Sequence, residues 1–496
     1  MSCHSSMISA EFTREEIADA AAQGRLLSME IEFSLRCNYR CQYCYVGQDL
    51  NGNVELSMEE SRSVILQAKA LGARKIVILG GEPMIYPKIK EMLQFIRDND
   101  LAVELFTNGT NVTPEMARFL YTSGIQVVLK MNSFEEAIQD QLAGVKGAYK
   151  IIQAAFKNLR DAGFPSEGHF MAVSTVICAQ NLHEIPHMWK WLRDQTIIPY
   201  FEIMTPQGNA TCNSALDVDL PTLQKVFNQL SEIDRTRYGY DWEPQPPLVA
   251  SWCLRHQFSC LVNAYGYVMP CVGITIPIGN IRERTLAEIL KDSEVIGDLR
   301  AYKDCIRGPC ATCEKSAKCY GCRGAAYQMT GDYLASDPLC WRNTDRADDI
   351  LKLPAPVHGM IPHQGAMKVV DRIISVGERV AVVEADIRKD LLFVNEDGTV
   401  AHELYIELIA QAAAAMNGFR TAHRNGKIEG LLIGARNVEV LATAKVGDTL
   451  SIHVFKATRF GDFGIIEGKI FRADELLAHG EIKIWNGAMP APESTK

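Results

Sequence analysis

The stretch RCNYRCQYCYV, residues 36–46, places three thiols on one short loop and leaves a metal site incomplete. Cys37, Cys41 and Cys44 follow the strand-like run MEIEFSLR at residues 29–36, with no histidine or fourth cysteine close by. Three thiolates in a C-x3-C-x2-C spacing can each hold one iron of a cubane 4Fe–4S cluster, and the fourth iron then has no protein ligand. A zinc site would need a fourth ligand. A redox dithiol of Cys41 and Cys44 would leave Cys37 unexplained, and three unrelated buried cysteines are the remaining interpretation.

The first two hundred residues alternate between strand-like and helix-like stretches. Such alternation predicts an α/β fold with a parallel sheet, either flat or curled into a barrel. Ligands collect at the carboxyl ends of the strands in both versions, and the cysteine loop lies at that end. Ser57 and Glu60 form a capping box that predicts a helix over residues 57–72. The strand-like runs cover residues 29–36, 75–81, 101–109, 125–131, 169–176 and 200–206.

Length and charge narrow the setting. A chain of 496 residues exceeds what one core normally holds, so several domains are expected. The net charge of -9 and the lack of a Lys/Arg-rich run argue against nucleic acid as a partner. We find no signal-peptide pattern and no apolar run long enough to cross a bilayer. Fifteen cysteines in such a chain indicate metal or redox chemistry in the cytoplasm, where thiols stay reduced.

The spacing of the cysteines also marks a domain boundary. Eleven of them form the opening triplet and a second group of eight between Cys253 and Cys340, which leaves out Cys305, and none follows Cys340. The next segment, ILKLPAPVHGMIPHQG at residues 350–365, contains three prolines and starts a different pattern. We therefore expect a lead-in at residues 1–27, a barrel at 28–235, a cysteine-rich domain at 236–349 and a further domain at 350–496.

The first half of the chain resembles the radical S-adenosylmethionine (SAM) enzymes. Tyr43 matches the position that packs against adenine in that family, and GGEP (Gly80, Gly81, Glu82 and Pro83) matches the motif that borders the SAM amino group. GGEP alone would be read as a strand-to-helix turn, and its pairing with the cysteine triplet strengthens the resemblance. The TNG turn containing Asn108 also ends a strand on the ligand face. The resemblance implies a partial (β/α)6 TIM-type barrel, a SAM-binding 4Fe–4S cluster and an electron donor such as flavodoxin or ferredoxin.

The second cysteine group resembles the SPASM extension of radical SAM enzymes, which carries two auxiliary 4Fe–4S clusters. Its two CxxC pairs alone would favour zinc, but eight cysteines are too many for one zinc site. Here two residues separate Cys319 from Cys322 where the family more often has three, so their sorting between clusters stays open. Fully coordinated clusters of this kind would relay electrons. The resemblance implies one cluster on Cys253, Cys260, Cys271 and Cys322, and another on Cys310, Cys313, Cys319 and Cys340. Cys3, Cys178, Cys212 and Cys305 are left as core or surface thiols.

The last third of the chain predicts an α+β hotdog fold. Residues 380–387, 450–460, 463–473 and 476–485 alternate like antiparallel strands with one buried face. A long alanine-rich helix, residues 402–420, precedes three of them and could lie in the curve of a sheet. IPHQGAMKVVDRI and ELIAQAAAAMNG resemble the hydroxyacyl-thioester dehydratases, and more closely the dehydratase-like proteins of aryl-polyene clusters.

Glu407 matches the helix carboxylate of those dehydratases, and the histidine candidate is His363, because the GHFP-type loop of the fatty-acid enzymes has no counterpart here. Such a pair suits dehydration, since one group takes the α-proton and the other protonates the departing hydroxyl. The alternative is structural: Glu403, Glu407 and Gln411 have the spacing of a solvated helix stripe, and His363 could bond to backbone. The domain would then bind a thioester without reaction or only form a homodimer.

Two enzyme classes stay open, and the fusion favours the first of them. In the first, the protein acts on a small or acyl-carrier-linked substrate, and the hotdog domain holds or processes the thioester. In the second, it modifies a peptide or protein, and the hotdog domain only assembles dimers. An iron–sulfur scaffold without activity conflicts with the open iron and the GGEP loop together.

Overall fold

The chain forms two compact units in the computed structural model, which describes residues 12–46, 54–350, 352–358, 360–421, 430–460 and 462–485. The first unit comprises Met1–Lys303, Gly308–Met329 and Tyr333–Ile350. The second comprises Asp304–Arg307, Thr330–Asp332 and Leu351–Lys496. The four-part division expected from the sequence stays a prediction.

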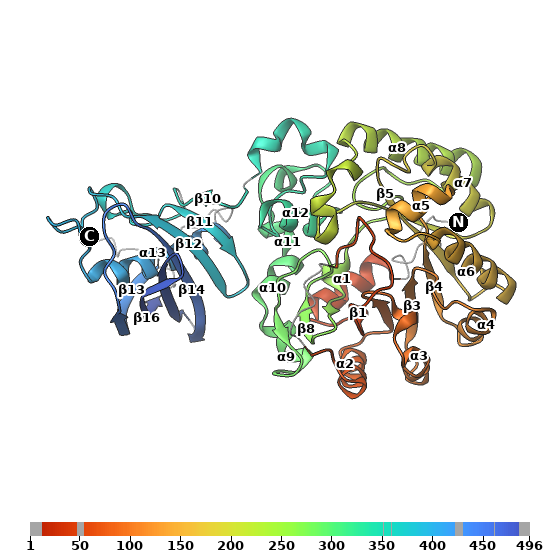
Figure 1. The fold of residues 1–496 in the computed structure, drawn as a ribbon, viewed down its shortest axis with the longest axis horizontal. Coiled ribbons are helices and arrows are strands. Elements are labelled where there is room, and N and C mark those ends of the chain that lie inside the picture. The colour runs from red at the N-terminus through yellow and green to blue at the C-terminus, as the bar shows by residue number, and fades with distance from the viewer. Residues whose placement is uncertain are drawn as a thin grey trace, which may run out of the picture. The chain divides into compact units, whose positions relative to one another are not determined.

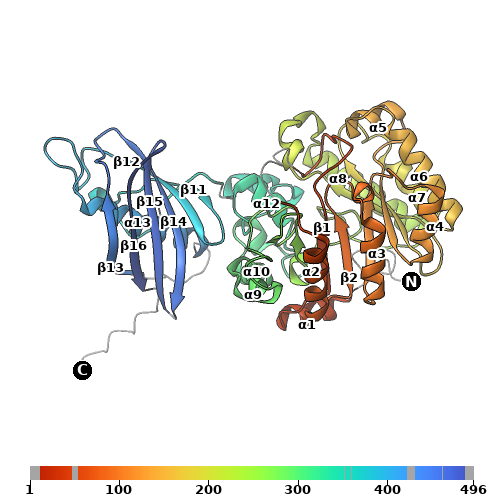
Figure 2. The ribbon, with the colours of Figure 1, turned by 60° about the horizontal axis from the view of Figure 1, so that its bottom comes forward.

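The first unit is built on a sheet whose first six strands run parallel, as the alternation predicted, and form the partial barrel that the resemblance implied. Helices lie along its outer side (Figure 1, Figure 2). The strand order is β6-β5-β4-β3-β2-β1-β7-β8-β9. The strands are β1 (Ser28–Glu32), β2 (Lys75–Leu79), β3 (Ala102–Thr107), β4 (Gln126–Lys130), β5 (Met171–Ile177), β6 (Ile198–Ile203), β7 (Leu261–Val262), β8 (Tyr267–Met269) and β9 (Gly279–Asn280).

Helices separate the successive parallel strands of the first unit along the chain. The predicted capping box is confirmed at the start of α2, where the Glu60 N–H donates to Ser57 Oγ over 3.1 Å and the Ser57 N–H donates to Glu60 over 2.8 Å. The helices are α1 (Arg14–Ala22), α2 (Met58–Ala70), α3 (Ile89–Asp98), α4 (Pro114–Thr122), α5 (Glu136–Ala143), α6 (Ala148–Ala162), α7 (Ile185–Asp194), α8 (Leu220–Ile233), α9 (Leu286–Asp292), α10 (Glu294–Arg300), α11 (Tyr302–Cys305) and α12 (Arg323–Thr330).

Strand β1 connects the barrel to the cysteine-rich segment. All five of its residues are buried, because β2 pairs with one edge and β7 with the other. Glu30 of β1 lies opposite Leu261 of β7, and its N–H donates to the Cys260 carbonyl over 2.8 Å. The second cysteine group is therefore fixed directly beside the strand that leads into the first.

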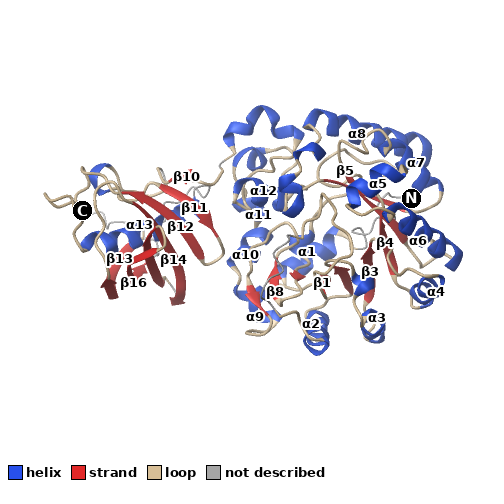
Figure 3. Cartoon of the chain, viewed as in Figure 1, coloured by secondary structure: helices blue, strands red, loops and turns tan. Residues whose placement is uncertain are grey.

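The second unit has the predicted hotdog form, an antiparallel sheet packed on the long helix α13 (Glu403–Thr421) (Figure 3). The helix approaches the sheet closely, since a β-carbon on Gly468 would lie 2.5 Å from the Ile409 side chain. The strand order is β10-β11-β12-β14-β15-β16-β13. The strands are β10 (Ala355–Pro356), β11 (Arg372–Val376), β12 (Val380–Asp386), β13 (Leu431–Val440), β14 (Thr449–Phe460), β15 (Phe463–Arg472) and β16 (Glu475–Trp485).

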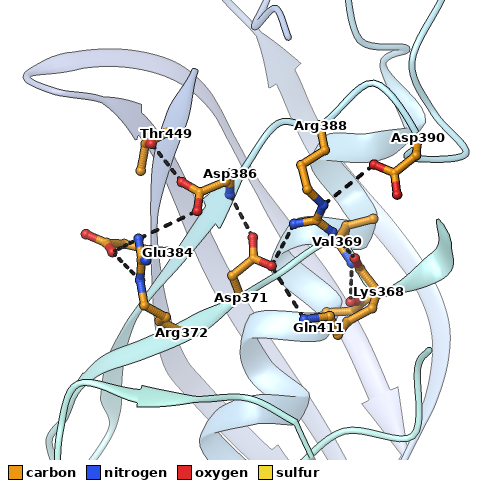
Figure 4. A network of polar contacts seen from close by, with 10 residues as sticks. All are labelled: Lys368, Val369, Asp371, Arg372, Glu384, Asp386, Arg388, Asp390, Gln411 and Thr449. Atoms are coloured by element: carbon orange, nitrogen blue, oxygen red, sulfur yellow. Dashed lines mark hydrogen bonds and ion pairs between the residues drawn. The ribbon is translucent and has the colours of Figure 1, made fainter. Parts of the chain in front are cut away.

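A polar network ties the strand ends of this sheet together (Figure 4). The Asp371 carboxylate accepts hydrogen bonds from Arg388 over 2.7 Å and from the Asp386 N–H over 2.8 Å. Thr449 of β14 donates to the Asp386 carboxylate over 2.7 Å. The ends of β11, β12 and β14 are thereby joined beside the loop that enters the sheet.

Two short segments from the cysteine-rich region belong to the second unit. The Arg307 guanidinium lies 4.7 Å from the centre of the Phe419 ring and donates to the Phe419 carbonyl near the end of α13. The guanidinium also lies 3.3 Å from the Asp332 carboxylate. A cation over an aromatic face and a carbonyl in the last turn of a helix both favour an arginine here. Among the described residues, no helix has the length and apolar character needed to span a membrane.

Candidate functional site

The three thiols of the cysteine loop, residues 37–44, lie beyond the carboxyl end of β1. Cys37, Cys41 and Cys44 are each half-buried, and they line a cavity of about 1010 Å³. Lys130 of β4 and Glu202 of β6 line the same cavity. A concave site of this size can hold a cofactor and a small substrate together.

The GGEP loop contacts the cysteine loop through its backbone. The Gly81 N–H donates to the Ser34 carbonyl over 3.0 Å, and the Glu82 N–H donates to the Arg36 carbonyl over 2.9 Å. A β-carbon on Gly81 would lie 1.9 Å from that Arg36 oxygen. Only glycine fits there, because any side chain would push the start of the cysteine loop away.

A second glycine holds the other end of the cysteine loop. Gly208, after β6, has a φ of +56°, and a β-carbon there would lie 2.5 Å from the Cys44 carbonyl oxygen. The next residue, Asn209, donates its N–H to the Cys44 carbonyl over 2.9 Å and its side-chain amide to the Cys41 carbonyl over 3.0 Å. The loop is thus fixed by its carbonyls, which leaves the thiols directed at the cavity they line.

The Glu82 carboxylate joins the GGEP loop to the end of β3. It accepts hydrogen bonds from the Thr107 hydroxyl over 2.7 Å, the Asn108 N–H over 2.6 Å and the Met84 N–H over 2.9 Å. Burial raises the pKa of Glu82 to about 7, although these donors act in the opposite direction. The side chain is therefore occupied in holding the loop. Gly80, Gly81, Glu82 and Pro83 all line the cavity, and their roles toward SAM stay predictions.

Tyr43 and Asn108 also line the cavity. The Tyr43 hydroxyl accepts from the Asn132 amide over 2.6 Å, and the Lys130 ammonium lies 5.1 Å from the centre of the Tyr43 ring. The Asn108 amide donates to the Asn38 side chain over 3.1 Å and lies 3.9 Å from the Cys37 sulfur. Both predicted residues are therefore beside the thiols, and their contacts with a cofactor stay predictions.

Sequence reasoning missed a buried pair behind the cysteine loop. The Tyr45 hydroxyl donates to Glu32 over 2.6 Å and accepts from the Gly80 N–H over 3.2 Å. Burial raises the pKa of Glu32 to about 7, and the Tyr45 hydrogen bond opposes the rise. No spacing rule links a strand carboxylate to a tyrosine thirteen residues later, so only the folded structure reveals the pair.

The second cysteine group separates into two neighbourhoods, and the first contains Cys253, Cys271 and Cys322. Burial raises the pKa of the Cys322 thiol, and the negative charges of Asp337, Cys253 and Cys271 add to the rise. Gly273 and Gly324 bring the two loops together, since a β-carbon on Gly273 would lie 2.7 Å from Gly324 Cα. Cys260 is fully buried at the start of β7.

The other neighbourhood contains Cys310, Cys319 and Cys340. Burial raises the pKa of Cys340 to about 12, and the charges of Asp337, Cys310 and Cys319 contribute. Cys313 follows in the same turn, with its N–H 3.4 Å from the Cys310 carbonyl. Cys319 has Cys310 and Cys340 as neighbours, and Cys322 has Cys253 and Cys271, as in the two ligand sets that the resemblance implies. The ligand roles of these cysteines stay predictions. Of the remaining thiols, Cys178 and Cys305 are buried and Cys212 is exposed, whereas Cys3 lies outside the described residues.

In the second unit, the fold brings the predicted acid/base pair together. His363 Nε2 lies 3.6 Å from the Glu407 carboxylate, and their side chains are 32% and 18% exposed. His363 Nδ1 is buried without a hydrogen-bond partner. The pair is therefore close enough to exchange a proton through a substrate or a small movement, and its catalytic role stays a prediction.

The interpretation of Glu403, Glu407 and Gln411 as a solvated stripe is wrong for Gln411, which is fully buried. Its amide donates to the Glu407 carboxylate over 2.7 Å and to the Met367 carbonyl over 2.6 Å, and it accepts from the Val369 N–H over 3.0 Å. Gln411 therefore orients Glu407 and fixes the loop that follows His363.

Comparison with protein families assigns the parts of the chain. Residues 31–192 match the radical SAM superfamily, residues 253–322 match the SPASM iron–sulfur cluster-binding domain, and residues 355–493 match the ApeP-like family, described as ApeP dehydratase. The chain joins radical SAM, SPASM and ApeP-like dehydratase domains. Its radical SAM domain makes it an enzyme, and the dehydratase-like domain adds a second module.

Relatives of the radical SAM and SPASM part carry two kinds of name. The "AdoMet-dependent heme synthase" of Methanosarcina barkeri is 27% identical over 348 residues, 64% of this chain and 96% of the relative. The "PqqA peptide cyclase" of Streptomyces rochei is 28% identical over 369 residues, 70% of this chain and 97% of the relative. The crystal structure of Streptococcus suis SuiB bound to S-adenosylmethionine covers 64% of this chain and 78% of SuiB, with a TM-score of 0.51. At 16% identity this likeness concerns the fold.

The cofactors of these domains are SAM and 4Fe–4S clusters, one at the radical SAM site and two in the SPASM domain. The surroundings of the thiols fit such clusters, because N–H groups point at the sulfurs as they do at thiolate ligands. The donor-to-sulfur distances are 3.4 Å for Tyr39 and Cys37, 3.5 Å for Lys315 and Cys313, 3.3 Å for Gly321 and Cys319, 3.3 Å for Ala325 and Cys322, and 3.5 Å for Asn343 and Cys310.

Proposed function

We propose that the radical SAM domain abstracts hydrogen from a small or acyl-thioester-linked substrate and that the hotdog domain binds or dehydrates the thioester. The observation that carries the proposal is the His363–Glu407 pair, 3.6 Å apart, in a chain that also holds the cysteine-lined cavity. The match to a dehydratase family supports a thioester carried on a small molecule or an acyl carrier protein.

In the radical SAM domain, Cys37, Cys41 and Cys44 hold the cluster, and Tyr43, Asn108 and the GGEP loop receive SAM. A cluster and SAM bound there would supply a 5'-deoxyadenosyl radical, the chemistry that takes a hydrogen atom from the substrate. The protein's part is to orient the reactants and exclude water, and the fixed carbonyls of the cysteine loop serve that purpose. An electron donor such as flavodoxin or ferredoxin would supply the electron for the cleavage, and the auxiliary clusters held by the second cysteine group would accept or pass on the second electron.

In the hotdog domain, one member of the His363–Glu407 pair removes the proton α to the thioester carbonyl and the other protonates the departing hydroxyl. Gln411 supports a catalytic role for Glu407, because its amide donates a hydrogen bond to the Glu407 carboxylate from the helix side and so orients it. General acid–base groups in such positions contribute about 10²- to 10⁴-fold to the rate.

The experiment uses the full-length protein, reconstituted without oxygen and given a 3-hydroxyacyl thioester on acyl carrier protein. Mass spectrometry should detect loss of water, and with deuterated acyl chains, deuterium in 5'-deoxyadenosine. Glu407→Gln should lower dehydration about 100-fold or more without changing SAM cleavage, whereas exposed Glu403→Gln should change neither. The proposal fails if the wild-type protein neither dehydrates the thioester nor transfers deuterium from it.

A second candidate is a peptide- or protein-modifying enzyme whose hotdog domain only forms dimers. The similarity to proteins named PqqA peptide cyclase supports it. Strand β13 lies at the edge of the hotdog sheet and exposes apolar side chains, since Leu431, Leu432 and Ile433 are 51%, 44% and 49% exposed. An exposed apolar edge strand can pair with a second copy of the chain, which supports a dimer. Transfer of deuterium from a labelled peptide, and not from an acyl thioester, would favour this candidate.

A cytoplasmic location suits both candidate functions, since cysteines that are not paired in disulfides need a reducing compartment.

A further inference from the structure

A buried histidine contacts one of the proposed cluster ligands of the SPASM domain. His256 lies in the short 3₁₀ turn Arg255–Gln257, between Cys253 and Cys260, and is 2% exposed. Its Nε2 is 3.2 Å from the Cys271 sulfur, and its Nδ1 is 3.2 Å from the Tyr320 hydroxyl. The side chain thus bridges a tyrosine and a thiol in the interior of the first unit.

The chemistry of the two neighbours fixes the direction of both hydrogen bonds. A thiolate that binds iron has no proton, so it can only accept, and Nε2 must be the protonated nitrogen. In a neutral imidazole Nδ1 is then the acceptor, and the Tyr320 hydroxyl donates to it. The result is a directed chain of hydrogen bonds from Tyr320 through His256 to Cys271.

This donor differs from the others around the auxiliary thiols. Tyr320 and His256 are both buried, so no bulk water competes for the bond to sulfur, and hydrogen bonds strengthen one another in such surroundings. The contact distance is shorter than the 3.3–3.5 Å of the donors to Cys310, Cys313, Cys319 and Cys322.

We propose that His256 is a positioning residue that raises the reduction potential of the auxiliary cluster bound by Cys253, Cys260, Cys271 and Cys322. An N–H bond to a ligand sulfur stabilises negative charge, and the reduced cluster carries one more electron than the oxidised cluster. The donor therefore stabilises the reduced form more. Tyr320 strengthens the effect by fixing the tautomer. The inference rests on the proposed assignment of Cys271 as a ligand.

The test measures the potentials of the clusters in full-length reconstituted protein, by redox titration followed with electron paramagnetic resonance. His256→Phe keeps a ring of similar size and removes the donor, and we expect the potential of one auxiliary cluster to fall. A tenfold change in the reduction equilibrium, about 59 mV for one electron, is the expected size. His256→Gln retains an N–H and should recover part of the shift, and Tyr320→Phe should produce a smaller shift in the same direction.

Asn343→Ala serves as the matched control, because its amide donates to Cys310 of the other neighbourhood. This variant should change the reduction potential of a different cluster from the one whose potential changes in His256→Phe. Unchanged potentials in His256→Phe at full iron content would overturn the inference. So would loss of about four irons in both His256 variants, because His256 would then be needed to hold the cluster. Failure of the ligand assignment itself is distinguishable, since Cys271→Ala would then keep about twelve irons instead of losing about four.

Discussion

Gly81 lies so close to Arg36 that a β-carbon on the glycine would be 1.9 Å from the arginine carbonyl oxygen. Gly81→Ala should therefore displace the start of the cysteine loop and lower both SAM cleavage and iron content. Misplacement of reacting groups by about 1 Å can cost about 100-fold in rate, and we expect a loss of that order in 5'-deoxyadenosine formation. Liquid chromatography of the nucleoside measures it.

Gly297→Ala is the matched control for this change. Gly297 lies inside α10, and no atom would meet its β-carbon within 4 Å. Alanine there should leave SAM cleavage unchanged and raise stability slightly, because glycine is costly inside helices. Equal activity in the two variants would show that the Gly81 contact does not hold the loop.

The buried carboxyl of Glu32 should make stability depend on pH. Its pKa is raised to about 7 in the folded protein, from an ordinary value of 4.5. The stability that this group contributes is therefore fully present below pH 4.5 and is lost as the pH rises through about 7. Glu32→Gln removes the titration. The melting temperature of the variant relative to wild type should rise across this window, by the equivalent of about 3 kcal/mol at most. A constant difference between the two proteins would contradict the burial of an ionisable group there.

Gln411 should be important for the stability of the hotdog domain. Gln411→Ala leaves the buried Val369 N–H and the part-buried Met367 carbonyl without this partner, and an unsatisfied buried group costs about 1–3 kcal/mol. We expect a lower melting temperature in calorimetry of the full-length protein. Glu403→Ala, an exposed position one turn before Glu407, should change stability by about 0.5 kcal/mol or less. Equal melting temperatures for the two variants would contradict the hydrogen bonds of Gln411.

Removal of one thiol of the cysteine loop should prevent one 4Fe–4S cluster from binding and leave the other two in place. Wild-type protein with three 4Fe–4S clusters should contain about twelve irons, and Cys41→Ala about eight. Formation of 5'-deoxyadenosine should cease. Iron analysis and nucleoside chromatography measure the two effects, and persistent SAM cleavage in this variant would exclude the cysteine loop as the site.

Much of the fold could be predicted because its signals are local. Short β-rich runs that end in turn residues identify β1–β6, alternation of apolar residues identifies four strands of the hotdog sheet, and the capping box at Ser57 identifies the start of α2. Strands β7–β9 and β10 were missed because they have only two or three residues, and the five-residue β11 was missed as well. Strand β13 was missed because LLIGARNVEV does not alternate, and its residues are largely exposed at the sheet edge.

The candidate site divides in the same way. The cysteines were found because iron clusters impose short spacings, and His363 and Glu407 were paired by resemblance. The partners that tune these groups come from distant segments: Asn132 reaches Tyr43, Gly208 contacts Cys44, and His256 reaches Cys271. No local pattern encodes such contacts, because each depends on how strands and loops meet in space.

The most direct test of the account is the response of the cluster on Cys37, Cys41 and Cys44 to SAM. Electron paramagnetic resonance spectra of the reduced, full-length protein should be recorded before and after SAM is added, without oxygen. The account predicts that the signal of one cluster changes when SAM binds its open iron, and that Cys41→Ala abolishes the change. Identical wild-type spectra with and without SAM would contradict it.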